Sequence, residues 1–217
     1  MIQLLKVSSR SRSLDFQFIL YLAHGTFINI RNQEGRCNSN IGWQGVHWGT
    51  INRMSLSSRC HNTDTIEHEF LHALGMNHEQ TRPDRDEHIN LFLDRVEEYF
   101  RYNFDIKQGW MDTNSPYDKR SVMHYGHDAF MTDEAEDAGH SSVMTDKVTG
   151  DPVQYPDAIR MSSEDAFQLA GMYESFCPPD FVPASTCDDG QRYLSNFAWY
   201  IFPDFISTIN LLFKRWY

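Results

Sequence analysis

The chain has 217 residues, which is enough for one ordinary domain with a single hydrophobic core. Hydrophobic residues make up 41% of the sequence and charged residues 23%, proportions that are typical of a globular rather than a disordered protein. Acidic residues outnumber basic ones by 30 to 19, and the formal net charge is −11. This balance argues against a nucleic-acid partner, because binding to a phosphate backbone requires concentrated Lys and Arg.

Residues 1–25 do not form a convincing signal peptide. Such a peptide needs an uninterrupted apolar core of about 7–15 residues, but Lys6, Asp15 and several Ser and Arg residues interrupt this one. The stretch DFQFILYL has β propensity, so the segment could add a strand to the domain. The alternative is that it does not belong to the domain, and we treat residues 1–25 as an atypical N-terminal segment.

Short β-rich stretches separated by turns occupy residues 26–60. TFINIR and INRMSLS predict strands, whereas NQEGRCNSN between them has the composition of a turn. The stretch GWQGVHWG is compatible with an ordinary hairpin.

A helix is predicted to begin at Thr63 or Asp64. Asp64 followed three residues later by Glu67 resembles a capping box. The apolar side of this helix is formed by Ile66, Phe70, Leu71 and Leu74.

The same helix carries His68 and His72, which are four residues apart and therefore project from one face. Glu69 lies about 100° around the helix from His68. Gly75 tolerates positive φ and can end the helix, so that the chain turns back and brings His78 to the same point. Three converging imidazoles leave a fourth position open, which indicates a catalytic rather than a structural zinc site. The alternative, a core helix with incidental histidines, leaves Gly75 and His78 unexplained.

Further along the chain, Pro83 ends this region, and we expect the charges of the run TRPDRDEH to be solvated. A second helix is predicted from apolar residues at three- and four-residue spacing, namely Leu93, Val96, Phe100 and Phe104. Residues 131–157 are turn-rich and are expected to be irregular. The last helix is predicted to begin at Ser162 and to run to about Tyr173.

Four cysteines occur, and none forms a C-x-x-C pair, so a thiolate zinc site is not indicated. Three disulfide connectivities are open among Cys37, Cys60, Cys177 and Cys187.

The histidine segment resembles the astacin family of secreted zinc endopeptidases. The family signature H-E-x-x-H-x-x-G-x-x-H-E-x-x-R-x-D-R-D is matched by His68, Glu69, His72, Gly75, His78, Glu79, Arg82, Asp84, Arg85 and Asp86. Met76 stands where the family usually has Phe. The resemblance covers about residues 26–177 and implies that the N-terminal part of the family's catalytic domain is missing upstream of them.

The resemblance also implies roles for residues outside the helix. Residues 121–127 read SVMHYGH, in which S-x-M-H-Y matches the family's Met-turn. Met123 is then expected to lie beneath the zinc without ligating it, and Tyr125 to be a mobile group that approaches the metal and stabilises the tetrahedral intermediate. His124 is expected to be structural.

For the cysteines, the resemblance favours a Cys37–Cys60 disulfide. Cys177 would then pair with Cys187, pair outside the chain or stay free, and the first of these is the weaker expectation. The family places the glutamate after the third histidine against the freed N-terminus of the mature enzyme. For Glu79 an equally good interpretation is a surface carboxylate that pairs with Arg82 or Arg85. The family would use one edge strand to bind extended substrate, and we place that edge at residues 42–49.

The predicted fold class is α+β, a metzincin-like zinc peptidase. A small twisted mixed sheet and the zinc helix would lie above an irregular half that carries the Met-turn and a C-terminal helix. Residues 26–177 form the catalytic domain in this interpretation. Residues 178–217 form an uncertain apolar tail, in which Pro203, Asp204 and Asn210 argue against a membrane span.

The predicted function is zinc-dependent hydrolysis of peptide bonds in extracellular proteins or peptides, with one zinc ion as cofactor. Three imidazoles would hold the ion, which acidifies its bound water, and Glu69 would act as general base. We expect a secreted protein. The alternative is an inactive, zinc-stabilised protein-binding module whose cleft is incomplete. Intact Glu69 and Tyr125 favour the enzyme.

Overall fold

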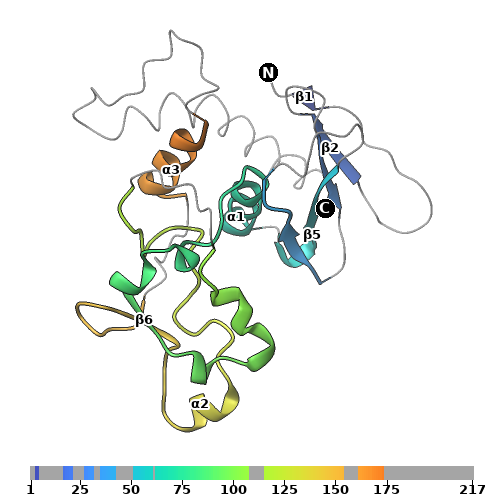
Figure 1. The fold of residues 1–217 in the computed structure, drawn as a ribbon. Coiled ribbons are helices and arrows are strands. Elements are labelled where there is room, and N and C mark those ends of the chain that lie inside the picture. Colours follow the sequence, from blue (N-terminus) through green and yellow to red (C-terminus); the bar gives the residue numbers. More distant parts are fainter. Residues whose placement is uncertain are drawn as a thin grey trace. The chain divides into compact units, whose positions relative to one another are not determined.

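The computed structural model describes residues 3–4, 17–21, 27–31, 35–42, 51–60, 62–107, 115–153 and 161–173. The chain forms two compact units (Figure 1). The first comprises Met1–Met76 with Leu169–Tyr217, and the second comprises Asn77–Gln168.

A mixed five-stranded sheet dominates the first unit. Its strands, in the spatial order β1-β2-β3-β5-β4, are β1 (Gln3–Leu4), β2 (Gln17–Tyr21), β3 (Phe27–Arg31), β5 (Ile51–Leu56) and β4 (Cys37–Ser39). β3 and β5 run parallel in the register Phe27↔Ile51, and the other neighbours are antiparallel. The strands expected in TFINIR and INRMSLS are present, and β2 lies in the segment for which a strand was one of two alternatives. The turn expected around Cys37 is wrong in part, because β4 pairs there with the edge of β5.

The helix α1 (Thr63–Ala73) supplies the other half of this unit's core. Alternate apolar residues of β3 and β5 pack with one stripe of α1. The buried cluster consists of Ile28, Ile30, Met54, Leu56, Cys60, Ile66, Phe70 and Ala73. The helix begins where predicted, but its N-cap is Asn62 rather than Asp64. Asn62 has an extended backbone, and its side chain accepts a hydrogen bond from the Thr65 N–H at 2.8 Å. Asp64 instead lies in the first turn, where a carboxylate also stabilises the helix.

The predicted Cys37–Cys60 disulfide is present. It joins β4 to the 3₁₀ turn η2 (Ser58–Cys60), which immediately precedes α1. This covalent link therefore holds the start of the histidine-bearing helix to the edge of the sheet.

The second unit has little regular structure. Its only described sheet pairs β6 (Ile89–Leu91) with β7 (Met144–Asp146), and it has a short helix, α2 (Asp133–Asp137). Its described 3₁₀ segments are η3 (Glu79–Thr81), η4 (Arg85–Glu87), η5 (Leu93–Arg95) and η6 (Glu98–Phe104). The core of this unit consists of Ile89, Val96, Phe104, Val143, Met144 and Val153. The irregular structure expected over residues 131–157 is thus interrupted by α2 and β7.

The α-helix predicted over Leu93–Phe104 is wrong. Its apolar spacing is real, but the backbone leaves the helical path at Val96, which forms a β-bridge with Met131. The next residue, Glu97, donates its N–H to the Phe130 carbonyl at 3.0 Å. These long-range bonds divide the segment into η5 and η6.

The helix α3 (Ser163–Tyr173) begins one residue later than predicted and ends at Tyr173, where its end was expected. Ser162 and Asp165 exchange hydrogen bonds in a capping box, at 2.9 Å from the Asp165 N–H to Ser162 Oγ and 2.8 Å in return. Within the described part of the chain, no helix has the length and apolar character required to cross a membrane. The pairing of Cys177 with Cys187, the tail and residues 43–49 of the proposed substrate-binding edge lie outside the described residues.

Candidate metal centre

The end of α1 turns the chain sharply after His72. Gly75 adopts a φ of 106°, a left-handed conformation that glycine tolerates and other residues do not. Its N–H donates to the His72 carbonyl at 2.8 Å, and the Met76 N–H donates to the Leu71 carbonyl at 3.0 Å. This pair of bonds is a Schellman motif, with the buried side chains of Leu71 and Met76 at the positions of its usual apolar contact. The motif ends the helix and sends the chain toward His78.

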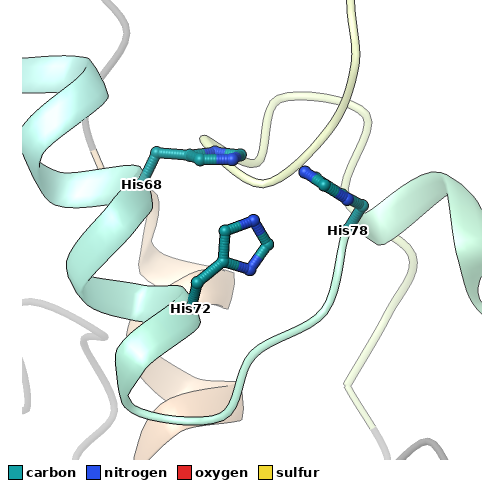
Figure 2. Close-up of side chains that lie close together, drawn as sticks. All are labelled: His68, His72 and His78. Atoms are coloured by element: carbon teal, nitrogen blue, oxygen red, sulfur yellow. The ribbon is translucent and has the colours of Figure 1, made fainter. Parts of the chain in front are cut away.

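The three histidines converge. Their ligand nitrogens lie within 4.8 Å of one another, and Figure 2 shows the three rings pointing toward a common point. The ring centroids of His68 and His72 are 4.6 Å apart and the rings are nearly perpendicular, in a T-shaped arrangement. Three imidazole nitrogens are the donor set of a catalytic zinc site, so the residues present fit that ion.

The hydrogen bonding of His72 prepares it to be a ligand. Its Nδ1 lies 2.8 Å from the Met76 carbonyl oxygen. A carbonyl can only accept, so Nδ1 carries the proton and, in the neutral ring, Nε2 holds the lone pair. Burial, together with the nearby His68, lowers the pKa of His72 to about 4, so the imidazole is neutral at physiological pH. This backbone contact orients the ring in the way that outer-shell partners orient metal-binding histidines.

Glu69 is buried on the same helix, next to His68. Its Oε2 has no hydrogen-bond partner among the described residues. Burial raises the pKa of Glu69 to about 7. An unpartnered carboxylate whose charged form is disfavoured has a strong tendency to take up a proton, which is the property required of a general base.

The Met-turn residues lie in the second unit. Met123 is fully buried, and its carbonyl accepts the Glu79 N–H at 3.0 Å, directly after His78. The ring of Tyr125 lies 4.4 Å from the ring of His78 at a tilt of 54°. The structure therefore places Tyr125 beside one of the three predicted ligands.

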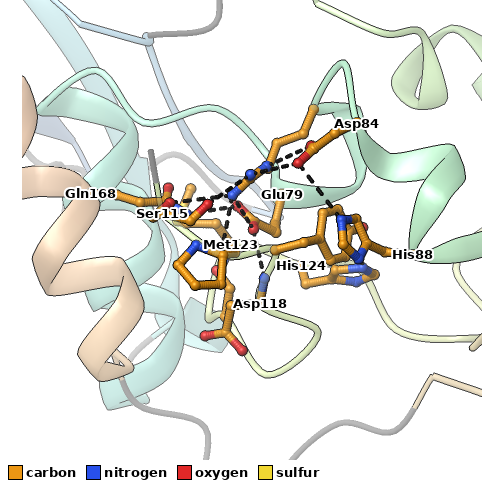
Figure 3. Close-up of polar contacts among 12 residues, drawn as sticks. Glu79, Asp84, His88, Ser115, Asp118, Met123, His124 and Gln168 are labelled. Carbon is orange, nitrogen blue, oxygen red and sulfur yellow. Dashed lines mark hydrogen bonds and ion pairs between the residues drawn. The ribbon is translucent and has the colours of Figure 1, made fainter. Parts of the chain in front are cut away.

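The charged residues after His78 are buried only in part. Within the run TRPDRDEH, Asp86 and Glu87 are exposed as expected, but Arg82 and Arg85 are buried, so the expectation of solvated charges is wrong for the two arginines. Glu79 is only 1% exposed, so its interpretation as a surface carboxylate is wrong. It accepts hydrogen bonds from Arg82 Nη1 at 3.0 Å, the Asp118 N–H at 2.8 Å and Gln168 Nε2 at 3.2 Å (Figure 3). Even with these three donors, burial raises the pKa of Glu79 to about 7.

Arg82 and Arg85 donate hydrogen bonds to backbone carbonyls of neighbouring segments and to carboxylates of the same motif. Arg82 forms a bidentate pair with Asp84, at 2.9 and 2.8 Å, and donates to the carbonyls of Ser115 and Pro116. Arg85 donates to the Phe104 carbonyl at 2.5 Å. A guanidinium has five donors in a planar fork, so one buried side chain can satisfy several carbonyls and a carboxylate together.

Asp165 is a buried residue that the sequence analysis did not connect to the site. Its carboxylate accepts from Ser121 Oγ at 2.5 Å and from the Val122 N–H at 3.1 Å, in addition to the Ser162 N–H of its own capping box. Asp165 therefore links the first turn of α3 to the start of the Met-turn. The spacing of Ser162 and Asp165 signalled the cap, but no local pattern signalled the partner 44 residues away.

Comparisons with known proteins show similarity to peptidases of the astacin family. A family model described as Astacin, a peptidase family, matches residues 12–174, beginning upstream of residue 26. The chain is 32% identical to meprin A subunit beta of Rattus norvegicus over 164 residues, which is 75% of this chain and 22% of that protein. It is 40% identical to high choriolytic enzyme 1 of Oryzias latipes over 105 residues, or 48% of this chain and 37% of that protein. This chain thus spans about a fifth to a third of these relatives.

The fold is also similar to a solved structure. High choriolytic enzyme 1, a hatching-enzyme zinc protease from Oryzias latipes, matches with a TM-score of 0.59 and 29% sequence identity. The similarity covers 71% of this chain and 72% of that one.

Proposed function

Because this chain belongs to the astacin family of peptidases, we propose that it is a zinc-dependent endopeptidase that hydrolyses peptide bonds in extracellular proteins or peptides. The observation that carries the proposal is the convergence of three imidazoles, together with the buried carboxylate of Glu69, whose Oε2 has no hydrogen-bond partner among the described residues. A binding module that used zinc only for stability would not need that carboxylate, since burying it without a hydrogen bond is unfavourable.

His68, His72 and His78 hold the ion in this proposal. When bound, zinc supplies a Lewis acid that makes water more acidic and polarises the scissile carbonyl. Glu69 accepts the proton of the attacking water and later delivers it to the leaving amine. The Tyr125 phenol donates a hydrogen bond to the oxygen on which negative charge develops.

The compartment follows from the disulfide. Cys37 and Cys60 are bonded within one unit, and disulfides of this kind persist in oxidising compartments. We therefore place the protein outside the reducing cytosol, with polypeptides as its substrates.

The test is a fluorescence-quenched peptide assay with and without a chelator, in which zinc content is measured by mass spectrometry. Glu69→Gln should retain zinc and lose about 10²–10⁴-fold in kcat, the usual contribution of a general base. His78→Ala should lose zinc, whereas His140→Ala, which changes an exposed histidine, should lose neither zinc nor activity. Zinc-loaded wild-type protein without chelator-sensitive cleavage would support the inactive binding module, and normal turnover by Glu69→Gln would remove Glu69 from its role.

A further inference from the structure

Buried side chains hold the peptide groups of Tyr125 on both sides. The Tyr125 N–H donates to Gln80 Oε1 at 3.1 Å, and the Tyr125 carbonyl lies 2.7 Å from His124 Nδ1. Gln80 and His124 are almost completely buried, at 0% and 3% exposed. No role was predicted for Gln80.

The orientation of His124 is unambiguous. The Tyr125 carbonyl can only accept, so His124 Nδ1 carries the proton and donates it. In the neutral ring Nε2 is then an acceptor, and the Tyr117 hydroxyl donates a hydrogen bond to it at 2.8 Å. Burial lowers the pKa of His124 to about 4, which keeps the ring neutral at physiological pH, and the two hydrogen bonds select its tautomer. The Tyr117 ring is itself stacked on the His88 ring, with centroids 4.7 Å apart, and this contact helps to hold the Tyr117 hydroxyl against His124.

The orientation of the Gln80 amide is equally determined. A backbone N–H can only donate, so the atom facing Tyr125 is the amide oxygen. Gln80 Nε2 has no partner among the described residues. Since an unsatisfied buried donor is unfavourable, an apolar residue would suit this position better if the glutamine only filled space.

A backbone hydrogen bond next to Gln80 also joins this segment to the Met-turn. The Glu79 N–H donates to the Met123 carbonyl at 3.0 Å, one position before the Gln80 contact. The segment that follows His78 is therefore bonded to the Met-turn at two successive points. The Tyr125 ring lies 4.4 Å from that of His78, with Phe104 and Phe130 at 5.7 and 5.6 Å on its other sides.

We propose that Gln80 and His124 are positioning residues for Tyr125. They hold its backbone in place, so that the phenol moves only by rotation about its side-chain bonds and returns to the same place beside His78. This inference rests on the proposed function, because it assigns Tyr125 to the reaction. A small displacement of a catalytic group is costly, since a shift of about 1 Å can lower a rate by about 10²-fold.

The first arm of the test measures the attachment without metal or substrate. Amide hydrogen exchange of Tyr125 is followed by NMR in the zinc-free chain. Gln80→Met, which removes the acceptor but keeps the length, should accelerate exchange of this amide at least about tenfold. Gln80→Glu, which keeps an acceptor oxygen, should preserve protection. Gln168→Met removes another buried amide, which donates to Glu79, and should leave the exchange of Tyr125 unchanged.

The second arm measures kcat and KM in the zinc-loaded enzyme. Gln80→Met and His124→Leu should each lower kcat by roughly 10–100-fold at similar KM. Gln80→Glu and His124→Asn, whose amide can donate from the position of Nδ1, should recover most of the loss. In a Tyr125→Phe background the loss caused by Gln80→Met should disappear, because no phenol remains to be positioned.

Equal losses from Gln80→Met in the wild-type and Tyr125→Phe backgrounds would overturn the inference, as would unchanged Tyr125 exchange in Gln80→Met. If Gln80→Met does not fold, Tyr125 amide exchange is measured in Gln80→Glu instead. Loss of Tyr125 protection in that variant would also overturn the inference. Failure of the proposed function is distinguishable, since it appears as a wild type without chelator-sensitive cleavage whatever the exchange rates are.

Discussion

At the residue scale, Gly75 determines where the chain goes after the histidine-bearing helix α1. Its φ of 106° is a conformation that costs an L-residue about 1–2 kcal/mol. A Cβ at this position would also lie 2.9 Å from Met172 Cε, the flexible end of a side chain that can move aside. The backbone conformation, rather than the space, is therefore the reason for glycine here.

We predict that Gly75→Ala lowers the free energy of unfolding by about 1–2 kcal/mol and weakens zinc binding, because the turn that carries His78 is distorted. Urea denaturation and zinc titration measure the two effects. Gly139→Ala is a matched control, since Gly139 follows α2 with a φ of 83° and has open space around it. It should lose similar stability and bind zinc normally. Equal zinc affinity in both variants would show that the turn at Gly75 is not required for zinc binding.

At the element scale, the loop after β7 is held by one carboxylate. Asp146 accepts the N–H groups of Val148 and Thr149 at 2.7 and 3.1 Å, and it forms an ion pair with Lys119. The hydrogen bond from Lys119 and these two backbone donors lower the pKa of Asp146 to about 2. The ionised carboxylate is thus favoured in the folded protein.

Because the folded pKa lies below the ordinary value of about 3.9, Asp146 contributes stability above pH 4 and loses it as the pH falls toward 2. We predict that Asp146→Asn is less stable than the wild type at pH 6 and that the difference shrinks at pH 3. Urea denaturation at the two pH values measures it. Asp151→Asn, an exposed change in the same loop, should retain the pH dependence of the wild type. If the stability difference between Asp146→Asn and the wild type grows on acidification, the predicted direction of the pH dependence is wrong.

At the scale of the whole molecule, the Cys37–Cys60 disulfide closes a loop with a sequence separation of 23. A loop of that length restricts the unfolded chain by an entropy worth about 3 kcal/mol. We predict that the double variant Cys37→Ser/Cys60→Ser unfolds at a lower urea concentration, with a loss of about 3 kcal/mol. Reduction of the wild type should reproduce at least this loss. An unchanged midpoint after reduction would show that the link does not limit the unfolded chain.

The sequence by itself determined the local parts of this protein. The spacing of His68, His72 and Gly75 set one face of a helix and its end, because both depend on backbone geometry over a few residues. The strands of TFINIR and INRMSLS and the start of α3 followed from similarly short patterns. The pairing of Cys37 with Cys60 came from the family resemblance rather than from spacing.

Only the tertiary structure decided which partners distant residues take. Val96 bridges Met131 and interrupts a helical pattern, Glu79 is buried among Arg82, Asp118 and Gln168, and Gln80 accepts the Tyr125 N–H. These contacts join residues as many as 89 positions apart. The physical reason is that a polar side chain satisfies its hydrogen bonds wherever folding brings a partner, and burial then makes that choice obligatory.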